Sequence, residues 1–173
     1  MTDVDLYNLQ PVFHLMGVGL AVAALPLAWL AWRQRHAAPS RRLQALTVLT
    51  LFLTFDLVLF GAFTRLTDSG LGCPDWPGCY GSASPVGAQV HITAAQTAMP
   101  TGPVTHSKAW VEMIHRYLAT SVGVLILVLT VAAWMSTRTQ GRGSKRNAPG
   151  PWLPTLTLVW VCVQGAFGAL TVT

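Results

Sequence analysis

LQALTVLTLFLTFDLVLFGAF, residues 43–63, is a run of 21 residues in which Asp56 is the single ionisable side chain. A helix rises 1.5 Å per residue, so about 20 apolar residues cross the roughly 30 Å hydrocarbon layer of a membrane. Three further runs have this length: residues 12–32, 109–135 and 152–173. The sequence therefore predicts an all-α integral membrane helical bundle of about four transmembrane helices, one domain over residues 1–173, in a lipid bilayer.

The basic residues predict how this bundle is oriented. Eight of the eleven Lys and Arg residues lie in two connections, residues 33–42 and 136–151. Two helices separate these connections, so both face the same side, and short positively charged loops stay cytoplasmic. We therefore expect the N-terminus and the connection 64–108 to face outward, on the periplasmic side of the inner (plasma) membrane. Because the charge of +5 is explained by orientation, we predict no nucleic-acid partner.

Two features of the apolar runs carry further predictions. The first run follows an acidic segment with Asp3 and Asp5 and is longer than the core of a signal peptide, so we expect it to stay in the membrane. Asp56 is costly within a membrane span and by default faces the bundle or a cavity. Its carboxyl either bonds to a neighbouring helix or belongs to a proton or substrate path.

The outward connection contains two of the three cysteines, in the stretch Cys73-Pro-Asp-Trp-Pro-Gly-Cys79. Thiols oxidise outside the cytoplasm, so a disulfide is plausible, with free or redox-active thiols as the alternative. A zinc site normally has closer cysteines and two further ligands, which this stretch does not offer. Within the connection, residues 91–99 are compatible with a short helix. Cys162 fits a small apolar core residue.

The polar segment best suited to ligand binding or catalysis is Glu112-Met-Ile-His-Arg116, near the outer end of the third run. Helical periodicity places Glu112, His115 and Arg116 on one face. An imidazole there suits a haem axial ligand, Arg116 suits a haem propionate, and Glu112 suits ligand orientation or proton transfer. The alternative is a Glu112–Arg116 ion pair at i, i+4 beside a structural histidine.

The remaining histidines give weaker signals. His14 lies near the outer end of the first run and fits a snorkelling or bundle-facing ring. His36 lies in a basic connection and is expected to be solvated. For His91 and His106, in the outward connection, nothing in the sequence supports a ligand role.

Two strings resemble one known family. TRLTDSGLGCPDWPGC, residues 64–79, followed by EMIHR, residues 112–116, resembles haem A synthase, and QGAFGALTV, residues 164–172, is similar to it too. The resemblance covers about residues 50–173. It implies two similar four-helix halves with outward haem sites, which oxidise the methyl group of haem O to the formyl group of haem A for terminal oxidase assembly.

The resemblance also implies roles for particular residues. His115 corresponds to an axial ligand of haem iron, Glu112 to the catalytic carboxylate, and Cys73 and Cys79 to the outer-loop disulfide pair. It implies haem b as cofactor and haem O as substrate, and no other metal is predicted. Haem O synthase or oxidase assembly factors, and a homo-oligomer, are the expected protein partners.

The sequence departs from this family in two ways. Residues 12–32 lie outside the resemblance and are expected to form an extra N-terminal helix. The helix that carries the histidine facing His115, and the second half, are missing, so we expect a truncated copy or a partner chain that supplies the rest. Two alternatives remain: a membrane electron-transfer subunit similar to cytochrome b, with His14 opposite His115, and an inactive membrane fragment.

Overall fold

The computed structural model describes residues 10–139 and 150–170, and within these ranges it contains five helices and no β-strand. The helices are α1 Gln10–Arg33, α2 Pro39–Leu66, α3 Gln89–Ala98, α4 His106–Thr139 and α5 Trp152–Leu170. All except α3 are long and apolar enough to cross a membrane. The prediction of a helical membrane bundle is confirmed, and the chain is a multi-pass membrane protein.

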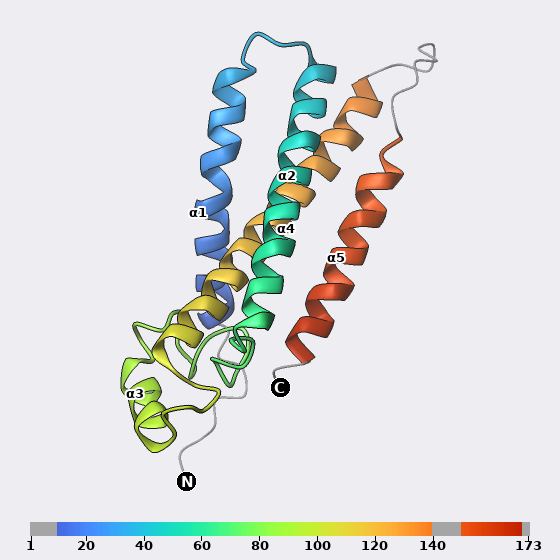
Figure 1. Cartoon of the computed structure of the whole chain (residues 1–173). Coiled ribbons are helices and arrows are strands. Elements are labelled where there is room, and N and C mark those ends of the chain that lie inside the picture. The colour runs from blue at the N-terminus through green and yellow to red at the C-terminus, as the bar shows by residue number, and fades with distance from the viewer. Residues whose placement is uncertain (1–9, 140–149, 171–173) are drawn as a thin grey trace.

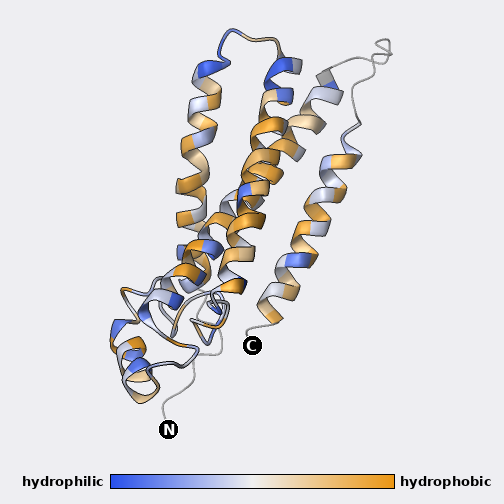
Figure 2. Cartoon of the chain, in the orientation of Figure 1, coloured by the Kyte–Doolittle hydropathy of each residue, from blue (hydrophilic) through white to orange (hydrophobic). Residues whose placement is uncertain are grey.

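The longest helix, α4, organises the bundle (Figure 1). It packs against α1, α2 and α5, whereas α5 contacts no other described helix. The connection between α2 and α4 lies at one end of the bundle, and the turn between α1 and α2 lies at the other. Apolar residues dominate the long helices, and hydrophilic residues concentrate at these two ends (Figure 2). This distribution is the one expected of helices that span a bilayer.

Small residues bring α1 and α4 into close contact. A side chain added at Gly19 would overlap the side chain of Thr120, and Ser121 Oγ donates a hydrogen bond of 3.1 Å to the carbonyl oxygen of Gly19. Small residues and interhelical hydrogen bonds of this kind stabilise helix pairs in membranes, where burial of apolar surface contributes little. The predicted N-terminal helix is thus an integral part of the bundle.

Three of the four long helices, α1, α2 and α4, extend beyond the predicted apolar runs. The helix predicted over residues 43–63 begins at Pro39 and ends at Leu66, and the one predicted over residues 109–135 covers His106–Thr139. Ala38 is extended and Pro39 suits the first helical turn, so α2 begins before its apolar part. Apolar runs thus locate only the membrane-crossing part. Asp3, Asp5, residues 140–149 of the second basic connection and residues 171–173 lie outside the described residues.

Residues 67–105, which we call the cap, fold onto the first turns of α4. The cap contributes Cys73, Cys79 and Ile92 to a buried cluster that Ala109 and Met113 of α4 complete. The short helix predicted over residues 91–99 is confirmed as α3, Gln89–Ala98. Because α3 supplies a fully buried Ile92, the cap has a core of its own against α4.

Two expectations about single residues are wrong within the described structure. Asp56 is exposed on α2 rather than turned into the bundle, because the buried residues of this helix, Leu46, Thr50 and Thr64, lie on a different face. Cys162 is exposed and not a core residue, since α5 has no buried residue among those described.

Candidate functional site

The cap is closed by a disulfide between Cys73 and Cys79, whose Cα atoms are 4.9 Å apart. Both cysteines are fully buried. The predicted pairing is therefore present, and residues 73–79 form a closed ring that lies against α4. The free-thiol alternative does not apply to this pair.

Glu112 points from α4 into this ring. Its Oε2 accepts a hydrogen bond of 2.7 Å from the backbone N–H of Cys73, and its Oε1 accepts one from Arg116 Nη2. The residue is 4% exposed. Both carboxylate oxygens are therefore used to hold the cap and the neighbouring guanidinium, one helical turn from His115.

Arg116 is directed at the ring as well. Its Nη1 donates hydrogen bonds of 2.8 Å to the carbonyl oxygen of Asp75 and 2.6 Å to that of Gly78. The ion pair between Arg116 and Glu112, which the sequence offered as an alternative, is thus present. Backbone carbonyl oxygens of the cap accept further hydrogen bonds from the guanidinium. Hydrogen bonds of this kind are what make a buried ion pair tolerable. The guanidinium thus links Glu112 to the backbone of the ring.

Sequence reasoning missed the importance of Asp75. Its two carboxylate oxygens accept hydrogen bonds of 2.6 Å from the backbone N–H groups of Tyr80 and Gly81, both of which have a positive φ. Asp side chains commonly stabilise turns in this way. The aspartate inside the ring, with Tyr80-Gly81 just after it, was the signal that would have predicted this turn.

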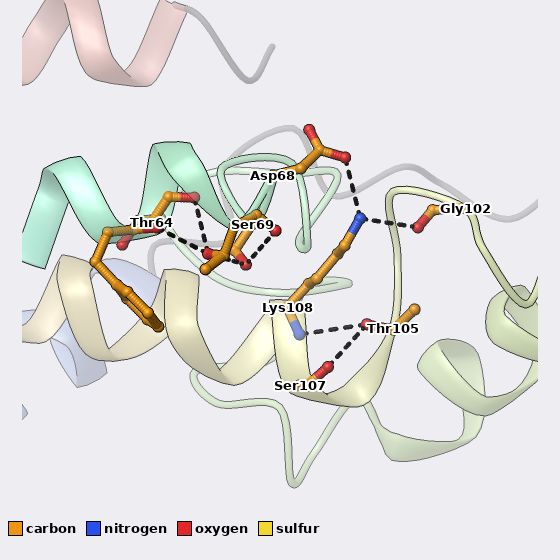
Figure 3. Close-up of polar contacts among 9 residues, drawn as sticks. Thr64, Asp68, Ser69, Gly102, Thr105, Ser107 and Lys108 are labelled. Carbon is orange, nitrogen blue, oxygen red and sulfur yellow. Dashed lines mark hydrogen bonds and ion pairs between the residues drawn. The ribbon is translucent and has the colours of Figure 1, made fainter.

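A second anchor joins the cap to the beginning of α4 (Figure 3). Lys108 Nζ donates hydrogen bonds to Asp68 Oδ2 at 3.1 Å and to the carbonyl oxygen of Gly102 at 3.3 Å. At Gly72 an added Cβ would lie 2.5 Å from the carbonyl carbon of Lys108 and 2.6 Å from the backbone nitrogen of Ala109. The cap backbone approaches α4 as closely as a glycine allows.

His115 is turned away from the cap, toward α2. The ring is half-buried and nearly parallel to that of Phe60, with centroids 6.3 Å apart and an interplanar angle of 9°. A Cβ added at Gly61 would lie 3.0 Å from His115 Nε2. Neither ring nitrogen forms a hydrogen bond with a described residue. An imidazole without a hydrogen-bond partner is a side chain of the type that binds haem iron, and its Nε2 packs closely against α2 at Gly61.

The other histidines do not join His115. His14 is exposed on α1, and the shallow pocket beside it is lined by α1 residues alone. His106 Nε2 is 2.9 Å from Thr93 Oγ1, and His91 stacks on Tyr80. His36 is exposed in the turn between α1 and α2, as predicted. Among the described residues, no three His, Cys, Asp or Glu side chains group together as ligands for a metal ion.

These features define a multi-pass helical membrane protein with a disulfide-closed cap and, one helical turn from Glu112, a histidine without a hydrogen-bond partner among the described residues. Residues 44–173 match the family described as cytochrome oxidase assembly protein, and the chain belongs to that family. The match begins within α2, so α1 lies outside it.

Three relatives illustrate the similarity, each of them a haem A synthase. The protein of Shewanella oneidensis is 39% identical over 125 residues, which are 72% of this chain and 35% of the relative. Those of Bartonella quintana and Bacillus pumilus are 31% and 28% identical over 131 residues, covering 68% and 75% of this chain and 34% and 35% of the relatives. The chain thus spans about a third of their length. No solved structure matches the chain.

Proposed function

We propose that the chain takes part in haem A biosynthesis, as part of an enzyme that oxidises the methyl group of haem O to the formyl group of haem A for terminal oxidase assembly. Family membership supports the pathway, and the relatives named above are haem A synthases. The structural observation that carries the proposal is His115: a half-buried imidazole in a membrane bundle, with both nitrogens free of described partners. Such a ring is suited to bind iron.

In this proposal His115 is an axial ligand of a haem, with haem b as cofactor and haem O as substrate. A bound haem supplies the redox-active iron. The protein supplies position: Phe60 lies nearly parallel to the imidazole, and the backbone of α2 at Gly61 lies close to its Nε2. The apolar helices on either side keep bulk water from this part of the bundle.

Glu112 remains the proposed catalytic carboxylate, one helical turn from His115. Its oxygens accept hydrogen bonds from Cys73 and Arg116. A carboxylate in this setting is oriented by the cap, and both of its partners are hydrogen-bond donors that do not take up a proton from it. The disulfide-closed ring therefore acts as a support for the proposed catalytic group.

The orientation in the membrane is also a proposal. Arg33, Arg35, Arg41, Arg42 and Arg138 lie at the end of the bundle opposite the cap. Cytoplasmic loops are enriched in such residues, so we infer that the cap faces the periplasm from the inner membrane. Haem O synthase, oxidase assembly factors and a second copy of the chain remain the predicted partners.

An electron-transfer subunit similar to cytochrome b is the second function class. It requires a second imidazole that faces the same haem as His115. His14 was the candidate, but its ring lies on an exposed face of α1 among α1 residues. Nothing in the described residues favours this alternative over the first.

The direct test is an optical titration of the purified full chain with haem in detergent. We expect a Soret band that His115→Ala abolishes, because the iron loses its ligand. Expression in cells that lack haem A synthase, followed by chromatography of extracted haems, tests the reaction. Haem A formation supports the enzymatic assignment, whereas a Soret band that survives His115→Ala excludes this residue as the ligand.

A further inference from the structure

Asp56 is an ionisable side chain deep inside a membrane span, and it is exposed on α2. It precedes Phe63, the end of its apolar run, by seven residues, which places it about 10 Å below the nearer membrane surface. Its carboxyl forms no hydrogen bond or ion pair with any described residue. An aspartate side chain is too short to reach the surface from this depth, and an ionisable group within a span is costly without a partner. We therefore expect this carboxyl to meet a group from outside the monomer.

The neighbours of Asp56 form one stripe along α2, which we call the Asp56 stripe. Its members follow one another at alternating intervals of four and three residues: Ala45, Leu49, Phe52, Asp56, Leu59 and Phe63. This repeat is the one that lets a helix pack along a second helix at a shallow angle. Within the monomer Phe52, Leu59 and Phe63 are 61%, 54% and 49% exposed. The stripe therefore has the pattern of a helix contact, and the monomer leaves most of it uncovered.

Lipid is the simplest occupant of an apolar face in a membrane, but it suits another face of α2 better. Leu51, Phe55 and Val58 are equally exposed, and no ionisable side chain interrupts them. Acyl chains offer no hydrogen bond, so they suit this second face and leave the carboxyl of Asp56 unpaired. The contrast between the two faces of one helix points to a protein partner at the Asp56 stripe.

The partner must present a polar group at the depth of Asp56, and a second copy of the chain meets this requirement. Copies inserted in the same direction hold identical residues at the same depth. A two-fold axis along the membrane normal therefore brings the two Asp56 side chains together. A protonated carboxyl donates one hydrogen bond and accepts another, so two facing carboxyl groups can bond to each other. The apolar residues of the stripe pack against their own counterparts in the same arrangement.

We propose that two copies of the chain associate in the membrane through the Asp56 stripe, with the two Asp56 carboxyl groups hydrogen-bonded to each other. Hydrogen bonds between helices support association in membranes, where burial of apolar surface contributes little. A single polar residue within a heptad stripe also fixes the register of the two helices. The inference goes beyond the proposed function and does not depend on it, because no part of it involves haem.

The first test is a scan of single cysteines along α2 of the full chain in membranes. The background is Cys162→Ser, which removes the exposed cysteine of α5, and Cys73 and Cys79 are already joined. Three variants of the stripe are expected to form disulfide-linked dimers with a membrane-permeant oxidant: Leu49→Cys, Phe52→Cys and Leu59→Cys. Three matched controls on the second apolar face are expected to stay monomeric: Leu51→Cys, Phe55→Cys and Val58→Cys.

The second test measures the contribution of Asp56 itself. Energy transfer between two separately labelled preparations of the full chain gives the dissociation constant of the dimer in detergent. We expect Asp56→Leu to weaken the dimer about three- to thirtyfold, the range known for hydrogen bonds between membrane helices. Asp56→Asn should retain association, because its amide both donates and accepts hydrogen bonds. Val58→Leu, on the second apolar face, is the control and should leave the dissociation constant unchanged.

Several results would overturn the proposal. Cross-links of equal yield on both faces, or none on the stripe, show that the stripe is not the contact between copies. A dimer that Asp56→Leu leaves unchanged or strengthens refutes the role of the carboxyl. A cross-link between the stripe and a different protein assigns this face to another chain and overturns the second copy as its occupant. None of these measurements uses haem, so their failure leaves the proposed function standing, and a missing Soret band leaves this inference standing.

Discussion

His115 and Arg116 are consecutive residues of α4, yet they lie in opposite environments. Arg116 faces the cap, where Glu112 and the carbonyl oxygens of Asp75 and Gly78 accept hydrogen bonds from its guanidinium. His115 faces α2, where its ring has aromatic and glycine neighbours but no hydrogen-bond partner among the described residues. Polar groups that are fully paired mainly hold a structure together, whereas a buried or half-buried polar group without a partner calls for another explanation. Arg116 thus mainly holds the cap on α4, whereas His115 is the candidate ligand at the seam between α2 and α4.

The largest effect is expected from breaking the cap junction. Arg116→Leu leaves the carboxylate of Glu112 buried without its cation, a change that typically costs roughly 3–5 kcal/mol. We expect a loss of this size in the free energy of unfolding in detergent. Arg41→Leu, which removes an exposed arginine of α2, serves as the control. Equal stability of the two variants would show that the cap junction does not hold the fold.

A smaller loss is expected where the cap backbone approaches α4. In Gly72→Ala the new methyl group would overlap the backbone of Lys108 and Ala109, so the cap must shift, at roughly 1–3 kcal/mol. Gly70→Ala is the matched control, because nothing lies within 4 Å of its added Cβ. Thermal unfolding of the two variants measures the difference, and similar melting temperatures would contradict the close approach.

At the seam, a substitution should affect ligand binding more than stability. Gly61→Ala places a methyl group 3.0 Å from His115 Nε2, which displaces the ring by a few tenths of an ångström. We expect haem affinity to fall by about tenfold, as for other residues that position metal ligands. Stability should change by no more than about 1 kcal/mol, since alanine favours the helix. Gly123→Ala on α4, with open space around its added Cβ, is the control; equal haem affinity in both variants would refute the role of Gly61.

The smallest effect is expected at the outer edge of the cap. Lys108 is paired with Asp68, whose side chain is 88% exposed, and exposed ion pairs contribute roughly 0–1 kcal/mol. Lys108→Met should therefore lower the free energy of unfolding only slightly, and high salt should reduce the difference. A loss as large as that of Arg116→Leu would mean that Lys108 has a role beyond this pair.

Much of the fold could be predicted from local sequence. Apolar runs located the four long helices, and the short helix in the cap followed from its own segment. The cysteine pair indicated the ring. Helix periodicity put Glu112, His115 and Arg116 near one another, but it could not tell which neighbour each would contact. That depends on where the cap folds back, over more than 30 residues of chain between Cys73 and Arg116.

Asp56 is a second residue whose contacts local sequence did not predict correctly. A carboxyl inside an apolar run predicts a partner in the bundle. In the described structure α2 uses another face to contact α4, so the carboxyl is exposed. No local rule specifies which stripe of a helix that is apolar all round will be buried.

The amino-acid sequence by itself determined that this chain forms membrane-spanning helices, because the hydrocarbon layer imposes a length and a polarity on every segment that crosses it. It also indicated the disulfide ring and determined the residue types of the candidate site. Only the tertiary structure decided that Arg116 holds the cap and that His115 faces Gly61. These outcomes depend on how helices that are distant in sequence rotate and approach one another. The packing of complementary side chains sets this arrangement, and local periodicity does not.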